Sequence, residues 1–210
     1  VSSIENDGLY LISSPIYDDL WYGEKTIGKK LDDNGKVISE GFDYTGFFSD
    51  ENLTNDTGFT LLADAVGAIK TNGKIHMLTS YKVSSSETVN VPEKVVNVVR
   101  ESSFKNAPMF EVIGMNESFT INATNPSSLI NFDGKGIETS VEKGGAFCLT
   151  NGSLYLNGAE KADGSKTIVI QNNIITASDA YSGGGYGGGV YLKGETKSTL
   201  SNCSITGNSV

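Results

Sequence analysis

The sequence predicts an all-β fold in which short strands wind into a solenoid, with one short helix at its N-terminal start. From about residue 75 onward, apolar and polar residues alternate in runs of about three to five residues, which is the period of a strand with one buried face. Asn, Gly, Ser and Asp fill the intervals between the runs. A Gly-Gly-small segment recurs later in the chain, as expected of stacked coils.

Charge divides the chain at about residue 58. Residues 1–57 carry 12 acids and 4 lysines, a net charge of −8, whereas residues 58–210 contribute only −1 to the net charge of −9 of the whole chain. We expect residues 1–57 to form an acidic, aromatic-rich β unit or cap, and residues 58–210 to form the N-terminal coils of the solenoid. Because the repeat is still running at Val210, we expect further coils or a neighbouring subunit at that end. The negative charge disfavours nucleic acid as a partner.

Aromatic residues are the candidate ligand contacts of the N-terminal unit. Tyr17, Trp21, Tyr22 and Tyr44 could stack on a sugar or a protein surface, although packing of a small β unit also explains them. In the same unit, the run from Lys30 to Ile38 predicts a hairpin, because Asp-Asn-Gly stands at its centre.

One helix is predicted over residues 60–70. Its apolar residues recur at helical spacing, and Thr60 is a candidate N-cap. Asn72 and Gly73 follow, and we expect them to end the element. This stretch is the best helix candidate in the chain.

The strands that follow are short, and no helical stretch separates them. This excludes doubly wound α/β folds and leaves a sandwich, a barrel or a solenoid. The expected inward pairs are Ile75 and Met77, Tyr81 and Val83, Val89 and Val91, Val96 and Val98, Phe110 and Val112, Phe119 and Ile121, Ile130 and Phe132, Phe147 and Leu149, Leu154 and Leu156, Ile168 and Ile170, and Val190 and Leu192, with Ile205 last.

A repeat favours the solenoid. The segment from Gly144 to Leu149 recurs, with changes, from Gly187 to Leu192, an offset of 43 residues (144 to 187). We interpret this offset as two turns of a coil of about 20 to 25 residues. Inward aliphatic residues of successive coils would then stack into one continuous core.

The repeat resembles those of right-handed parallel β-helix surface proteins of bacteria, namely adhesins and autotransporter passengers, including the polymorphic outer-membrane protein type. Gly144-Gly145-Ala146-Phe147 is similar to the Gly-Gly-Ala-Ile/Val/Leu motif of that type, and the run Gly-Gly-Gly-Val-Tyr-Leu from Gly187 is a second copy. The resemblance covers residues 60–210. It implies a right-handed parallel β-helix and a cell-surface location.

No residues are predicted to be catalytic, to hold a cofactor or to bind a metal. Glycoside hydrolysis needs two carboxylates across one bond, and the acids of the repeats are scattered. The single histidine, His76, is expected to be solvated on the outer face of a strand, and Cys148 and Cys203 to be buried thiols. The Gly183–Gly188 run has a Gly-x-Gly-x-x-Gly spacing, but a strand follows it where a dinucleotide site needs a helix.

Together these features favour a non-enzymatic extracellular protein, an adhesin or passenger that binds a host or matrix surface, protein or glycan. One alternative is a pectate-lyase-like or polygalacturonase-like enzyme whose active coils lie outside the chain. Another is a structural subunit of a surface layer or filament, since an uncovered coil end exposes strand edges.

Overall fold

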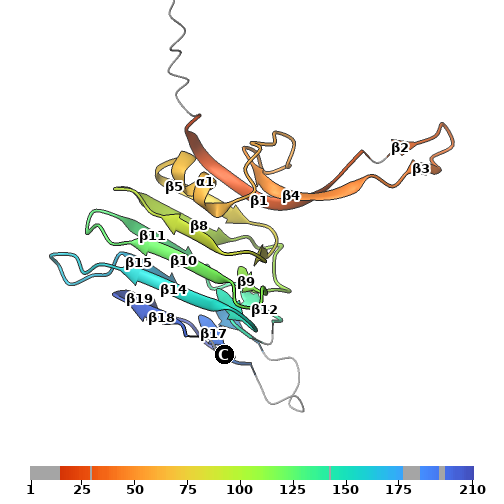
Figure 1. Cartoon of the computed structure of the whole chain (residues 1–210). Coiled ribbons are helices and arrows are strands. Elements are labelled where there is room, and N and C mark those ends of the chain that lie inside the picture. Colours follow the sequence, from red (N-terminus) through yellow and green to blue (C-terminus); the bar gives the residue numbers. More distant parts are fainter. Residues whose placement is uncertain (1–14, 29, 142, 177–184, 194–196) are drawn as a thin grey trace, which may run out of the picture.

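A computed structural model describes residues 15–28, 30–141, 143–176, 185–193 and 197–210. Within these ranges the protein is mostly β, with parallel sheets and a single helix, as the sequence predicts (Figure 1). Residues 1–14 of the N-terminal unit lie outside the described residues, as do Gly183 and Gly184 of the glycine-rich run. The described part of the chain has no helix long and apolar enough to cross a membrane.

Seven strands form the largest sheet, called sheet 1, in the order β19-β15-β11-β8-β5-β1-β4. β1 and β4 are antiparallel, and all other neighbours in sheet 1 are parallel. The strands are β1 (Tyr17–Ile27), β4 (Phe42–Phe48), β5 (Ile69–Met77), β8 (Val95–Arg100), β11 (Leu129–Asp133), β15 (Ile168–Gln171) and β19 (Cys203–Thr206).

Two parallel sheets of four strands complete the body. Sheet 2 consists of β6 (Tyr81–Val83), β9 (Phe110–Val112), β13 (Phe147–Leu149) and β17 (Val190–Leu192). Sheet 3 consists of β7 (Glu87–Asn90), β10 (Ser118–Ala123), β14 (Ser153–Gly158) and β18 (Thr199–Ser201). Two short pairs remain: parallel β12 (Glu138–Thr139) with β16 (Ile174–Ile175), and antiparallel β2 (Lys30–Leu31) with β3 (Val37–Ser39).

From β5 onward the chain passes through sheets 1, 2 and 3 in the same order each time, and we call one passage a circuit. The first circuit takes 23 residues (Ile75 to Val98), and the next three take 34, 38 and 35 residues (98 to 132, 132 to 170 and 170 to 205). Phe147 pairs directly with Val190. The 43-residue offset is therefore one circuit, and the predicted coil of about 20 to 25 residues is wrong beyond the first circuit, because loops between the sheets lengthen.

The inner faces of the three sheets enclose one core. Every predicted inward residue from Ile75 to Ile170 is buried, as the period of two requires. Phenylalanines stack across successive circuits: the ring centroids of Phe110 and Phe147 lie 5.0 Å apart. Neighbouring circuits therefore share one continuous apolar interior.

The prediction that the inward residues are buried is wrong for the last strands of sheets 1 and 2, β19 and β17. Leu192 is 45% and Ile205 46% exposed, and Val190 is half-buried. Each of these residues lies on an edge strand, which has a neighbour on one side only. Cys148 and Cys203 are free thiols and are half-buried rather than buried as expected.

The helix α1 (Leu62–Ala68) is shorter than the predicted range and begins differently. Its N-cap is Leu61, without a side-chain cap, so the expectation for Thr60 is wrong. Residues distant in sequence replace the cap, since the Leu62 N–H donates to Tyr81 Oη (2.9 Å) and the Ala63 N–H to Glu87 Oε1 (3.1 Å). Asn72, at a φ of 63°, lies inside β5 and not at the end of the helix.

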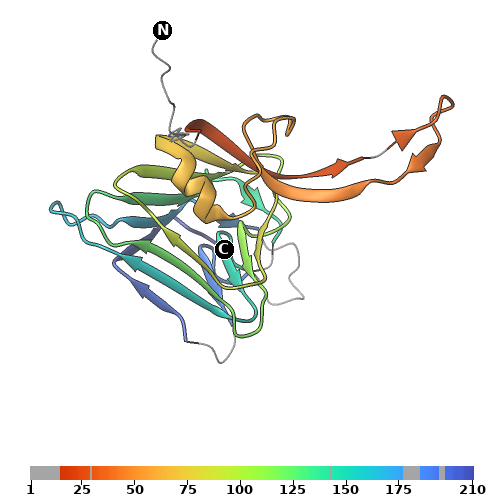
Figure 2. The ribbon, with the colours of Figure 1, turned by 45° about the horizontal axis from the view of Figure 1, so that its top comes forward.

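The N-terminal unit shares sheet 1 with the later strands, because β1 lies between β4 and β5. The β1–β4 ribbon leaves the body and continues into β2 and β3 (Figure 2), and Gly23 and its register partner Gly46 are the last buried pair of this ribbon. We call residues 24–28 and 30–45 the arm. At its tip, the Asp32 N–H donates to Lys36 O (2.8 Å), so the predicted Asp-Asn-Gly hairpin is confirmed.

Candidate functional site

The four aromatic residues proposed as ligand contacts do not lie together. Tyr22 is 6% exposed and packs in the core against Phe47, with ring centroids 4.8 Å apart. Tyr17 is half-buried and meets Phe59 edge-on at the rim of the core. Trp21 is half-buried, and because neighbouring side chains of a strand point to opposite faces, it lies on the outer face of sheet 1.

Trp21 stacks on His76 of the neighbouring strand. The ring centroids are 4.8 Å apart and the planes differ by 7°. The stack follows from the parallel register, which pairs Trp21 with His76 and places Ile75 and Met77 in the core. His76 faces outward as predicted, but the expectation that it is solvated is wrong: only 14% of its side chain is exposed, because polar and aromatic neighbours surround it.

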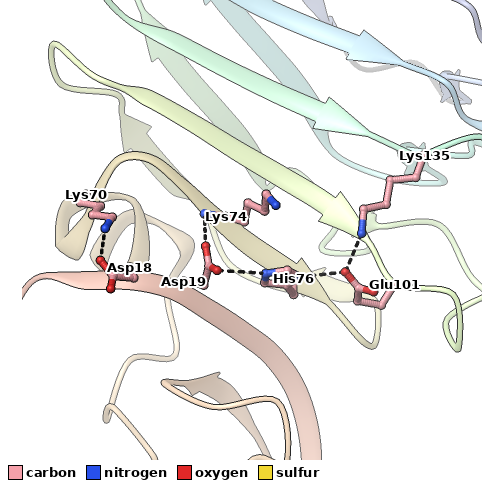
Figure 3. A network of polar contacts seen from close by, with 7 residues as sticks. All are labelled: Asp18, Asp19, Lys70, Lys74, His76, Glu101 and Lys135. Carbon is pink, nitrogen blue, oxygen red and sulfur yellow. Dashed lines mark hydrogen bonds and ion pairs between the residues drawn. The ribbon is translucent and has the colours of Figure 1, made fainter.

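A chain of polar contacts continues from His76 across the outer face (Figure 3). His76 Nδ1 donates to Glu101 Oε1 (2.7 Å), and the same oxygen accepts a hydrogen bond from Lys135 Nζ (2.9 Å). These groups come from β5, from the residue after β8 and from the residues after β11. Three successive circuits therefore contribute to one surface.

Asp19 flanks the other side of the imidazole. Its Oδ2 is 3.8 Å from His76 Nε2, too far for a hydrogen bond, so the contact is electrostatic only. Its Oδ1 accepts from the backbone N–H of Lys74 (2.8 Å), which fixes the carboxylate beside β5. Nε2 itself is buried and has no hydrogen-bond partner within the described part of the chain. The histidine is thus held between two carboxylates and beneath an indole.

Glu101 is the charged centre of this group. Burial raises the pKa of its carboxyl, but hydrogen bonds from His76 and Lys135 outweigh burial and bring that pKa below its usual value. The carboxylate is consequently ionised at neutral pH. It provides a fixed negative charge on the histidine on which the Trp21 indole stacks.

Tyr44 lies apart from Trp21, on β4. Its hydroxyl donates to Asp56 Oδ1 (3.0 Å), and its ring meets Phe48 edge-on at 5.9 Å. Burial, and then the hydrogen bond to Asp56, raise the pKa of this phenol. Phe48 is 1% exposed and is the register partner of Trp21, so it separates the two outer aromatic residues.

The Trp21 face, which we define as Asp19, Trp21, His76, Glu101 and Lys135, combines an aromatic ring with fixed charges of both signs. Such a surface is suited to stacking on a sugar ring or on a side chain of a partner protein. Among the described residues, no serine, threonine or cysteine is hydrogen-bonded to His76. The same part of the chain contains no group of three or more His, Cys, Asp or Glu residues that could hold a metal ion.

Sequence reasoning singled out Trp21 and missed the charged members of this face. Glu101 reaches His76, and Lys135 reaches Glu101, only because the first two circuits bring β5, β8 and β11 side by side. The alternating pattern could have separated Trp21 from Tyr22, since adjacent residues of one strand face opposite sides.

Comparison with known proteins gives no relative from which a role could be transferred. No family model matches the chain, and neither a curated protein nor a solved structure matches it. The resemblance of the Gly-Gly segments to bacterial β-helix repeats therefore remains a prediction. The geometry of the outer face is what supports a function.

Proposed function

We propose that this chain is part of a right-handed parallel β-helix that binds an extracellular surface, protein or glycan, without catalysis. The parallel sheets and their fixed order of succession support the solenoid part of this proposal. The observation that carries the binding part is the indole of Trp21, held flat against His76 beside the ionised Glu101. An aromatic residue held rigid in this way loses little conformational freedom when a ligand stacks on it.

Binding to immobilised glycans and matrix proteins tests this proposal. Trp21→Ala should weaken binding about tenfold or more, as expected for an aromatic contact at the centre of an interface. Trp21→Phe should retain part of the affinity, because a smaller ring can still stack. Tyr155→Ala is the matched control, since Tyr155 is a half-buried aromatic residue on an outer strand face of sheet 3.

Melting temperatures of all three variants separate a lost contact from a lost fold. If Trp21→Ala binds as tightly as the wild type while remaining folded, the Trp21 face is not the contact surface. If Tyr155→Ala weakens binding equally, the effect is not specific to that face.

A structural subunit of a layer or filament is a second candidate, favoured by the exposed aliphatic residues on β17 and β19. Leu192 and Ile205 lie on edge strands, which can accept further strands. Light scattering over a range of concentrations tests this role. A species that remains monomeric at high concentration would contradict it.

A further inference from the structure

A polar pocket lies where the arm joins the body. It encloses about 270 Å³ and is lined by Tyr22, Glu24, Thr45, Thr79, Ser80 and Lys82. β1 and β4 of the arm base form one wall, and the turn from β5 to β6 forms the other. Because Tyr22 and Trp21 point to opposite faces of β1, this junction pocket is separate from the Trp21 face.

One polar group of the pocket is left unsatisfied by the protein. Ser80 is 7% exposed, and its hydroxyl oxygen is buried without a hydrogen-bond partner among the residues that the structure describes. A buried hydroxyl without a partner is destabilising, and such groups in folded proteins call for an explanation. A ligand that hydrogen-bonds to Ser80 would supply the missing partner.

Two uncompensated charges stand at the mouth of the pocket. Glu24 and Lys82 are both exposed, and neither forms a salt bridge within the described residues. Burial, and then the charge of Glu87, raise the pKa of the Tyr22 phenol, and Glu24 is close enough for its charge to add to this. The carboxylate can accept two hydrogen bonds from neighbouring hydroxyl groups, and the ammonium can donate to a third.

We infer that the junction pocket binds a single sugar ring, as the terminal unit of a glycan or as a free monosaccharide. Hydroxyl groups of Thr45, Thr79 and Ser80 both donate and accept hydrogen bonds, which matches the hydroxyl groups of a sugar. The volume is slightly below the roughly 300–1,000 Å³ of pockets for drug-sized ligands, so one ring fits and a longer chain does not. The inference does not depend on the proposed function, because the Trp21 face takes no part in it.

Saturation-transfer NMR and calorimetry on the full chain test this inference, with methyl hexosides and N-acetylhexosamines as the probes. We expect at least one probe to bind with a Kd on the order of 1 mM or tighter. Glu24→Gln should weaken its binding about tenfold, because a hydrogen bond to a charged group becomes one to a neutral amide. Glu138→Gln, an exposed acid on β12, is the matched control and should leave the affinity unchanged.

Two further variants separate binding from folding. Ser80→Ala should weaken binding while leaving the melting temperature unchanged or higher, since it removes an unpartnered buried hydroxyl. Thr45→Phe, on the half-buried wall of β4, should abolish binding by filling the pocket. The inference is overturned if no probe binds, or if Thr45→Phe binds as well as the wild type. A loss of surface binding in Trp21→Ala with intact sugar binding would show that the two sites act independently.

Discussion

Arg100 offers the sharpest test of how neighbouring circuits are held together. It is the last residue of β8 and is fully buried. Its guanidinium donates to the carbonyl oxygens of Phe104 and Ala107 (both 2.9 Å) and of Gly145 (2.6 Å). Gly145 precedes β13, so one cation ties the loop after β8 to the next circuit. Burial lowers the pKa of Arg100 to about 10, which leaves it charged at neutral pH.

Replacing Arg100 with Met should destabilise the protein by about 3 kcal/mol. The Gly145 carbonyl keeps a hydrogen bond from the Met109 N–H (3.2 Å), so the carbonyls of Phe104 and Ala107 are the two that lose their donor. Each costs about 1–3 kcal/mol, so the two cost about 2–6 kcal/mol if water does not reach them. Removal of a buried charge that has no carboxylate partner offsets part of this loss. Arg100→Lys should be intermediate, because a single ammonium cannot reproduce the planar fork that spans three carbonyls.

Urea denaturation measures the free energy of unfolding, and hydrogen exchange locates the change. We expect faster exchange over residues 101–109 in Arg100→Met, since that loop loses its anchor. Lys105→Met is the matched control, because Lys105 lies exposed in the same loop, and it should change stability by less than about 0.5 kcal/mol. If Arg100→Met is as stable as the wild type, the carbonyls of Phe104 and Ala107 are satisfied without the guanidinium and the reasoning fails.

Two further predictions concern acid stability and the core. Because the pKa of Glu101 is lower in the folded protein, its ionised carboxylate stabilises the fold at pH values above the unfolded pKa of about 4.5, and this stabilisation is lost as the pH falls through the folded pKa. The melting temperature of Glu101→Gln should therefore fall less steeply in acid than that of the wild type. Equal slopes of melting temperature against pH below pH 4.5 would contradict this. Ile168→Asp should cost more than about 4 kcal/mol, and Val190→Asp about 1–2 kcal/mol, because the first site is fully buried and the second is half-buried on an edge strand. Equal losses in urea denaturation would mean that β17 is covered on both sides.

The inward residues of the body could be predicted from the sequence, because a strand places every second side chain on the same face. Ile130 and Phe132 alternate with polar residues, and both are buried. The register between circuits could not be predicted in the same way. Register depends on loops whose lengths differ between circuits, so a repeat found between Gly144 and Gly187 did not give the number of circuits that it spans.

The binding surfaces were harder to predict for a related reason. Trp21 stood out as the single tryptophan, but Glu101 and Lys135, which complete the Trp21 face through His76, lie in later circuits and carry no local signal. The burial of Arg100 could not be predicted either, since a cation at the end of a β-branched run is ordinarily exposed and not fully buried. What made these residues neighbours was the stacking of circuits and not any spacing along the chain.

The same stacking also shows why the Trp21 face stands out from the rest of the exterior. On sheet 3, Asn90, Asn122 and Asn157 form a ladder in which each amide donates to the one before it (both bonds 2.9 Å). That ladder satisfies its own polar groups and so serves stability. On sheet 1, the row through Trp21 and His76 continues as Val99, Asp133 and Gln171. Gln171 Nε2 donates to Asp133 Oδ2 (3.2 Å), whereas the side chains of Trp21, His76 and Val99 cannot form such a ladder. At the Trp21 end of this row, a half-buried indole stacks on a histidine that donates to an ionised carboxylate, and no ladder of like side chains forms there within the described residues. The proposed contact with a ligand rests on this difference from the asparagine ladder of sheet 3.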